Sequence, residues 1–205
     1  MLYERNGRGP RLHSSTVVAD SARLIGDVTV GERCYIDHGV VIESSGAPIT
    51  LGDETIVLAN SVLRSVGGTS RPAFPVTIGR RTLVGPACVL TGCQVGANCY
   101  LATAVLIFHG AEIGDDTRVG AGAIVHHHTR LPRGGRVGLR EIAVPGEAGP
   151  VCTGDVATAR ELLARADFFG TVFEEEEPVD QAELHDRVFT RLLDEVMGWD
   201  DRPLG

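Results

Sequence analysis

Aliphatic residues recur at every sixth position over most of this sequence. The longest unbroken run comprises Val95, Leu101, Ile107, Ile113, Val119, Val125, Leu131 and Val137. The residue that follows the aliphatic position is often Gly, as at Gly96, Gly114 and Gly120. Neither an α-helix nor an ordinary half-buried strand has this period. A six-residue repeat predicts a parallel β-helix, an all-β solenoid in which three short strands make one triangular coil.

The same period extends toward the N-terminus through three shorter runs. They are Val18 to Ile42, Leu51 to Leu63, and Ile78 to Leu90, and the step from Leu90 to Val95 is one residue short. Residues three repeats apart stack on adjacent coils, about 4.8 Å apart, so the aliphatic positions sort into three faces. The predicted faces are Val30, Leu51, Ile78, Val95, Ile113 and Leu131; Val18, Ile36, Val57, Val84, Leu101, Val119 and Val137; and Leu24, Ile42, Leu63, Leu90, Ile107 and Val125.

The repeat divides the chain into three segments. We expect an N-terminal arm over residues 1–15, the β-helix over residues 16–146 and a C-terminal helical segment over residues 147–205. Residues 67–75 are rich in Gly, Ser and Pro and predict a loop. Apolar residues at helical spacing predict one helix over residues 155–169, capped by Thr153 or Asp155, and a second over residues 180–197. We expect these helices to pack on the coils or between subunits.

The composition and net charge argue against some classes of binding partner. The 205 residues carry a formal net charge of −8, which argues against nucleic acid and anionic membranes as partners. No leader-like N-terminus and no bilayer-length apolar run is present, so we expect a soluble, cytoplasmic protein. Cys34, Cys88 and Cys99 lie four residues after an aliphatic position, where a small side chain turns inward. We therefore expect buried thiols and no disulfide framework.

Two segments resemble the gamma-class carbonic anhydrases and their relatives. One is VGPACVLTGCQVG at residues 84–96, which contains the shortened step, and the other is GDVTVG at residues 26–31, which leads to Val40-Val41-Ile42. The similarity covers about residues 15–140. It implies a left-handed parallel β-helix, an exception to the right-handed crossover rule, and a homotrimer with sites between subunits.

The resemblance also implies three zinc-binding His, two from one subunit and one from its neighbour. At the corresponding positions this chain has Arg64, Pro86 and Thr91. Arg is permanently cationic, Pro has no side-chain donor atom, and a Thr hydroxyl is a poor zinc ligand. We therefore expect no zinc at the family's position and no classical carbonic anhydrase activity.

A second departure lies beside the first. Where the family has Arg-Gly-Asp, this chain has Glu43-Ser44-Ser45. Glu43 and Arg64 fall in one column on adjacent coils, so we expect them to face each other at hydrogen-bonding distance. The pair is either a coordinated remodelling of the pocket or a structural ion pair, and both interpretations stay open at this point.

Histidines raise the possibility of a displaced metal site. His109 and His127 are predicted to stack on adjacent coils, and His126 continues the column of Glu43, Arg64, Thr91 and Phe108. His109, His126 and His127 together offer three imidazoles, but no carboxylate or Cys completes the ligand shell. The competing interpretation is a solvated or interface stack of His side chains.

The same histidines suggest general-base catalysis. Many hexapeptide-repeat proteins are acyltransferases in which one His deprotonates an acceptor and acyl-CoA is the co-substrate. His109 or His38 is the expected base, with His126 or His127 as alternates. No dedicated CoA motif is visible. A loose basic cluster near one end comprises Arg130, Arg133, Arg136 and Arg140, and such a cluster is more often a solvated face than a CoA-binding site.

The leading hypothesis is a zinc-free, repurposed relative of gamma carbonic anhydrase without a bound cofactor. Its inter-subunit pocket would act on a small organic substrate, with acyl transfer as the chemistry. The catalytic candidates are His109, His38, Glu43, Arg64 and Thr91, and the substrate-binding candidates are Arg71 and Phe74 in the loop together with Pro86, Phe108 and His126. The competing hypothesis is a catalytically silent trimeric scaffold. A metal-dependent carbonic anhydrase activity at the displaced His site is third.

Overall fold

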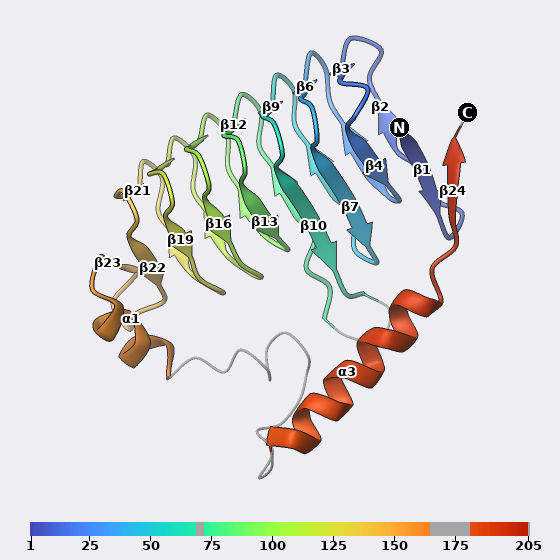
Figure 1. Cartoon of the computed structure of the whole chain (residues 1–205). Coiled ribbons are helices and arrows are strands. Elements are labelled where there is room, and N and C mark those ends of the chain that lie inside the picture. The colour runs from blue at the N-terminus through green and yellow to red at the C-terminus, as the bar shows by residue number, and fades with distance from the viewer. Residues whose placement is uncertain (69–71, 165–180, 205) are drawn as a thin grey trace.

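The computed structural model describes residues 1–68, 72–164 and 181–204, and it shows a left-handed parallel β-helix with three sheets (Figure 1). The A sheet contains, in order, β23 (Val151–Thr153), β22 (Ile142–Val144), β19 (Ile124–Val125), β16 (Leu106–Ile107), β13 (Val89–Thr91), β10 (Val62–Val66), β7 (Val41–Ser45), β4 (Arg23–Ile25), β1 (Leu2–Arg5) and β24 (Asp201–Leu204). The B sheet contains β2 (Arg11–Leu12), β5 (Val28–Val30), β8 (Ile49–Leu51), β11 (Val76–Ile78), β14 (Gln94–Val95), β17 (Glu112–Ile113) and β20 (Arg130–Leu131). The C sheet contains β21 (Arg136–Val137), β18 (Arg118–Val119), β15 (Tyr100–Leu101), β12 (Leu83–Val84), β9 (Ile56–Val57), β6 (Tyr35–Ile36) and β3 (Val17–Val18). The solenoid predicted from the six-residue repeat is confirmed.

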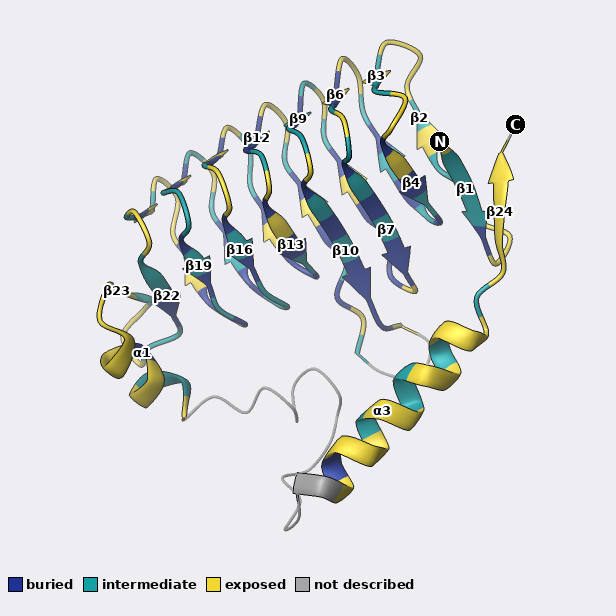
Figure 2. Ribbon diagram, in the orientation of Figure 1, coloured by how far each residue is buried: buried dark blue, intermediate teal, exposed yellow. Residues whose placement is uncertain are grey.

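Strand register reproduces the three predicted faces. On the A sheet, Leu63 lies opposite Ile42 on one side and Leu90 on the other. The B and C sheets stack their aliphatic residues in the same way, for example Ile78 on Val95 and Val84 on Leu101. The dark strand interiors in Figure 2 show where these side chains are buried. One aliphatic residue per strand therefore builds a continuous core along the axis of the solenoid.

Small residues complete the core at the corners. The position four residues after the aliphatic residue is buried in most repeats, and in many of them it holds Cys, Ala, Ser or Thr. Where it holds a hydroxyl, the side chain donates to a backbone carbonyl of the next coil: Ser61 Oγ to Gly85 O and Thr82 Oγ1 to Gly96 O, both at 2.8 Å. These bonds offset the cost of burying a polar group, so the corners stay tight without a larger side chain.

Burial protects four of the five thiols from reaction. Cys34, Cys88, Cys93 and Cys99 are buried and Cys152 is exposed, all five without a disulfide. Burial raises the pKa of each buried thiol, to about 12 for Cys93. We expect iodoacetamide at neutral pH to add a single label per folded chain, at Cys152, because alkylation needs a thiolate and access. Intact-mass spectrometry of Cys152→Ser should then show no label before unfolding. A label on any buried Cys in the folded protein would contradict this assignment.

The β-helix starts earlier than the sequence analysis placed it. β1 pairs in parallel with β4, and β2 pairs in parallel with β5, so residues 1–15 belong to the first coil and are not a separate arm. Leu12 lies six residues before Val18, so it continues the six-residue repeat into this coil. Leu2 and Leu12 both pack against the core.

The C-terminal segment is not only helical, because two of its strands close the ends of the A sheet. β23 pairs antiparallel with β22 at one end, and β24 pairs antiparallel with β1 at the other. A solenoid presents open strand edges at both ends, and an added strand satisfies their backbone N–H and C=O groups. Pro203 in β24 is compatible with this position, because β24 is itself an edge strand.

The two predicted helices are present in the described residues. α1 (Val156–Leu163) begins after Asp155, whose carboxylate accepts from the backbone N–H groups of Ala157 and Thr158, and it packs on β22 and β23. The remainder of the predicted first helix, residues 165–169, lies outside the described residues. α3 (Gln181–Met197) matches the second helix and leads into β24. Neither helix is long and apolar enough to span a membrane.

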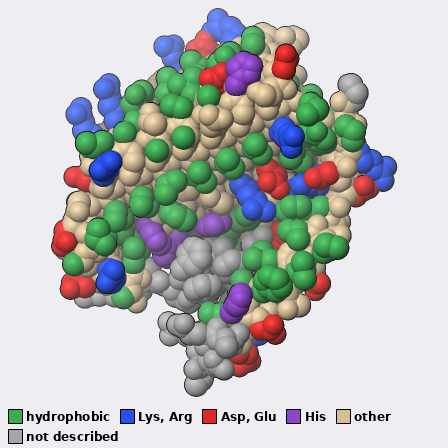
Figure 3. All heavy atoms as spheres, viewed as in Figure 1, with side chains coloured by type: hydrophobic (Ala, Val, Ile, Leu, Met, Phe, Trp, Pro, Cys, Tyr) green, Lys and Arg blue, Asp and Glu red, His purple; other side chains and the backbone are tan. Residues whose placement is uncertain are grey.

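The outer surfaces of the three sheets differ in polarity. The outward positions of the B sheet are polar, and include Thr29, Thr50, Thr77, Gln94 and Glu112. The A sheet instead presents an apolar band, visible in Figure 3, that includes Val41, Val62, Val89, Leu106 and Ile124. The C sheet presents a second apolar band of Val17, Tyr35, Ile56, Leu83 and Tyr100. Two of the three surfaces thus resemble interfaces more than solvated faces.

Candidate functional site

The predicted column of Glu43, Arg64 and Thr91 is present beside the apolar band of the A sheet. Arg64 of β10 lies opposite Glu43 of β7 and Thr91 of β13, and all three are partly buried. Arg64 Nε lies 3.9 Å from Glu43 Oε2, and it donates to Ser45 Oγ at 3.2 Å. The expected hydrogen bond between Glu43 and Arg64 is therefore an ion pair instead, since 3.9 Å is too long for a hydrogen bond.

The closer partner of Glu43 is Arg5, a residue that no pattern in the sequence singles out. Arg5 ends β1 and its side chain is only 6% exposed. Its Nη1 donates to Glu43 Oε1 at 2.8 Å, and its Nε and Nη2 donate to the two carboxylate oxygens of Asp201, each at 2.6 Å. Burial acts to lower the pKa of Arg5, but the hydrogen bonds to Asp201 and Glu43 outweigh it, so the pKa is raised. A permanently charged guanidinium thus joins the first coil to the C-terminal strand.

Trp199 covers this cluster from the C-terminal side. The guanidinium carbon of Arg5 lies 3.8 Å from the centroid of the indole ring, and that of Arg64 lies 5.8 Å from it. Both distances are within the range of a cation–π interaction. The indole therefore forms one wall of the column.

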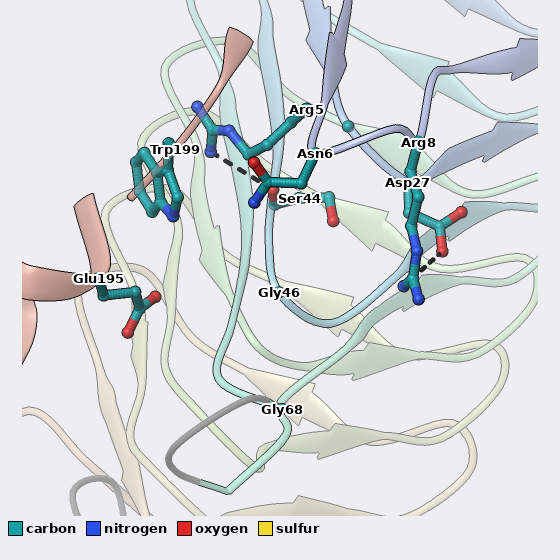
Figure 4. Close-up of a pocket in the computed structure, with 10 residues that line it drawn as sticks. Arg5, Asn6, Arg8, Asp27, Ser44, Gly46, Gly68, Glu195 and Trp199 are labelled. Carbon is teal, nitrogen blue, oxygen red and sulfur yellow. Dashed lines mark hydrogen bonds and ion pairs between the residues drawn. The ribbon is translucent and has the colours of Figure 1, made fainter. Parts of the chain in front are cut away.

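A pocket of about 280 Å³ opens beside Arg5 and Trp199 (Figure 4). Its walls come from the N-terminal hairpin, from the turn that carries Asp27, from the end of β7 and from the end of α3 at Glu195. Arg8 pairs with Asp27 across one side, with 3.6 Å between Nη1 and Oδ2. The sequence analysis missed this pocket, because the repeat does not place Arg5 and Trp199, from opposite ends of the chain, beside Asp27 and Ser44.

Phe74 closes the loop that begins after β10. Its backbone pairs with Val66 in both directions, and its side chain is buried. The ring packs edge-on against His109, with 5.6 Å between ring centroids, and it covers Gly92 so closely that a Cβ there would lie 2.5 Å from the Cβ of Phe74. This packing anchors the loop, and a contact of Phe74 with substrate stays a prediction. Arg71 lies outside the described residues.

Phe108, His126, His127 and His128 form a series of ring contacts at one corner of the A sheet. His126 stacks on Phe108 with 5.3 Å between ring centroids, and its Nδ1 lies 2.5 Å from His127 Nδ1. One of these two nitrogens must donate and the other accept, so the two rings are not both fully protonated. Burial lowers the pKa of His126, and His127 is 2% exposed. His127 is therefore packed inside this corner and not solvated.

Comparison with known proteins identifies the repeat. A family model described as the hexapeptide repeat of succinyl-transferase matches residues 75–109 and 92–126. The chain is 29% identical over 128 residues to mitochondrial gamma carbonic anhydrase 1 of Arabidopsis thaliana. The aligned segment covers 62% of this chain and 46% of the relative. This chain contains hexapeptide repeats and is similar to the gamma carbonic anhydrases over 128 of its residues. A carbonic anhydrase of Geobacillus kaustophilus is 30% identical over 115 residues, which covers 56% of this chain and 60% of the relative.

The relatives extend beyond the segment that they share with this hexapeptide-repeat protein. The chain spans about half the length of the Arabidopsis relative, 46%, and somewhat more of the Geobacillus one, 60%. Among solved structures, a candidate acetyltransferase from Bacillus cereus has a TM-score of 0.55 and 24% sequence identity, over 77% of this chain and 86% of that one. This likeness supports the fold alone.

Within one chain of the hexapeptide-repeat protein, the three residues that the resemblance places at the zinc-ligand positions fall in two places. Arg64 and Thr91 lie on the strands β10 and β13, whereas Pro86 lies in the turn that precedes β13. His38 lies at the corresponding turn before β7, where its Nδ1 is 2.9 Å from Ser21 Oγ. The A-sheet strands therefore lie between His38 and Pro86 on one side and the column on the other.

The described residues contain no group of three or more His, Cys, Asp or Glu side chains placed to hold a metal ion. His109 lies on the coil next to that of His126 and His127, where its carbonyl accepts from His128 N, and the Nδ1 atoms of His126 and His127 are turned toward each other. The displaced metal site stays a prediction.

Proposed function

We propose that this hexapeptide-repeat protein is an acyl-transferring enzyme that works without zinc at the three replaced positions. Its site is the column of Glu43, Arg64 and Thr91, its substrates are an acyl-CoA and a small organic acceptor, and it acts as a homotrimer. The proposal rests on one observation: a partly buried column that contains the charged pair Glu43 and Arg64 lies beside the apolar band of the A sheet. Burying charge is costly unless it is used or paired.

The chemistry of the side chains supports a site of this kind. Arg64 is held at Nε by Ser45 and Glu43, so its guanidinium is oriented before any substrate arrives. Arg5 holds Glu43 in turn. The name of the matching family model, a succinyl-transferase repeat, agrees with acyl transfer as the reaction.

His109 is a candidate base beside the column. It packs against Gly92, the residue directly after Thr91: a Cβ on Gly92 would lie 3.2 Å from His109 Cδ2. In the proposed step, a His imidazole takes the proton of the acceptor hydroxyl or amine while that atom bonds to the thioester carbonyl carbon. The carbon–sulfur bond then breaks, and the imidazolium returns the proton to the sulfur of CoA. His38 at the opposite corner would serve the same purpose from a neighbouring subunit.

The polarity of the three surfaces supports the trimer. The A and C sheets both carry apolar bands, and the B sheet is polar. A ring in which each subunit contributes two different surfaces buries both bands and leaves the third surface in water. Such a ring also supplies the second set of residues, His38 and Pro86, to the column of its neighbour, as the relationship to gamma carbonic anhydrases implies.

Removing both charges of the column should abolish transfer. We expect Glu43→Ala/Arg64→Ala to reduce the release of CoA thiol from acetyl-CoA or succinyl-CoA, in the presence of a panel of amine and hydroxyl acceptors, by about 100-fold or more. The matched control is Glu112→Ala/Arg130→Ala, an exposed ion pair of 3.2 Å on adjacent strands of the B sheet. The control should keep wild-type turnover. Equal turnover by the two double variants would contradict the proposed site.

The apolar bands favour a second candidate, a catalytically silent trimeric scaffold. It predicts that no acyl-CoA is consumed with any acceptor, although native mass spectrometry still finds a trimer. A monomer would contradict both proposals. A carbonic anhydrase reaction at the displaced His site remains the third candidate, and stoichiometric zinc or iron in the purified protein together with metal-dependent hydration of carbon dioxide would support it.

A further inference from the structure

Arg64 has one occupied edge and one open edge. Its Nε is engaged by Ser45 and lies near Glu43, but none of the described residues accepts a hydrogen bond from its two terminal nitrogens. The side chain is 40% exposed. A guanidinium presents parallel N–H donors in a planar fork that matches the two oxygens of a carboxylate. The open edge of Arg64 therefore has the shape of a carboxylate-binding group.

The neighbours of Arg64 complete a small binding surface. Thr91, directly opposite Arg64 in the register, has a hydroxyl that donates to no acceptor among the described residues. Trp199 stands 5.8 Å from the Arg64 guanidinium, and Phe108 continues the column beyond Thr91. Two polar donors thus lie between two aromatic side chains, an arrangement suited to a ligand with an acidic head and a small apolar body.

The local charge balance selects a monoanion. Arg5 and Arg64 carry two positive charges, and Glu43 and Asp201 carry two negative charges, so the cluster is neutral before a ligand binds. A carboxylate adds one negative charge against the open edge of Arg64. A phosphate dianion would add two close to the Glu43 carboxylate, and the repulsion between like charges would oppose it.

We infer that the acceptor substrate of this protein carries a carboxylate, which the terminal nitrogens of Arg64 and the hydroxyl of Thr91 bind beneath the indole of Trp199. This inference rests on the proposed function, because it names the substrate class of the same site. It also assigns a new role to Trp199, that of the wall that excludes water from the Arg64–carboxylate pair.

The protein contains its own reporter of binding. Trp199 is its single Trp, so the intrinsic indole fluorescence comes from the site alone. We expect sodium propionate to change the emission of the full-length protein with millimolar affinity. Propionamide, which has the same shape without the charge, and sodium chloride at equal ionic strength should produce no saturable change.

Variants connect the signal to Arg64. Arg64→Met should weaken propionate binding at least tenfold, and Arg64→Lys should restore part of it, because Lys keeps the charge but not the fork. Arg130→Met on the polar B sheet should titrate like the wild type. Wild-type titration by Arg64→Met, an equal response to propionamide, or tighter binding of inorganic phosphate than of propionate would each overturn the inference.

The outcomes for this inference and for the proposed function are separable. If the protein transfers acyl groups to neutral acceptors but does not bind propionate, the proposed function stands and the inference that the acceptor carries a carboxylate is refuted. Arg64-dependent propionate binding without turnover of any acyl-CoA would refute the transferase and leave the carboxylate site standing. Circular dichroism of each variant distinguishes a lost site from a lost fold.

Discussion

Leu63→Ala should lower the free energy of unfolding by about 3–5 kcal/mol. Leu63 is completely buried on β10, where it stacks between Ile42 and Leu90 on the two adjacent coils. Removing its terminal methyl groups leaves a cavity that the flanking strands cannot fill, because their spacing is set by backbone hydrogen bonds above and below. Urea unfolding at one fixed protein concentration measures the loss.

The matched control for this prediction is Leu139→Ala, the same substitution at a side chain that is 72% exposed. It should change the free energy of unfolding by no more than about 0.5 kcal/mol. Equal losses at the two positions would show that the stacked face containing Leu63 is not the stabilising core.

Arg5→Met should release the C-terminal segment from the first coil and disorganise the column. The substitution leaves Asp201 without its guanidinium and removes the cation beneath Trp199. It leaves Glu43 with Ser45 Oγ at 3.3 Å and Arg64 Nε at 3.9 Å. Breaking a fully buried pair costs about 3–5 kcal/mol. Asp201 is 37% exposed, so solvent screening reduces the expected cost to about 2–3 kcal/mol. A red shift of Trp199 emission and faster amide exchange in β24 would accompany this loss.

Arg8→Met is the control for the same hairpin. Arg8 is 64% exposed and pairs with Asp27 only at 3.6 Å, so its loss should leave Trp199 emission and β24 exchange unchanged. If both variants released β24 to the same extent, the attachment of β24 to the first coil would depend on backbone pairing with β1 and not on the side chain of Arg5.

Both ends of the chain contribute residues that hold the proposed site together. Arg5 from the first strand and Asp201 from the last meet at Glu43, so the strand that protects an open sheet edge also orients the acidic member of the site. A truncation of the C-terminal segment would therefore affect both the stability of the first coil and the geometry of the column.

Several features of the site could be predicted from the six-residue repeat alone. The columns of Glu43, Arg64 and Thr91, and of Phe108 and His126, follow from counting repeats, because every coil returns each position to the same face. The same counting failed at residues 1–15. It stopped at Val18, although Leu12 continues the period and β2 pairs with β5.

Other features lie outside the reach of a repeat. The spacing predicted that Glu43 lies next to Arg64. It did not predict how the two side chains are oriented, because Glu43 is held by a hydrogen bond from Arg5 and Arg64 by a hydrogen bond to Ser45. Phe74 appeared as a loop residue, and only the return of the chain along Val66 buries it against His109. Asp201–Leu204 shows no strand pattern, and it forms β24 because the edge of β1 is available to it.

The sequence by itself therefore determined the solenoid, its three faces and the order of residues along each column, since a six-residue period is local information that every coil repeats. The tertiary structure alone decided which ion pairs form, which aromatic rings cover the site and how the chain closes its open edges. Those contacts join residues as far apart as Arg5 and Asp201, and their energies depend on burial and geometry that no local pattern encodes.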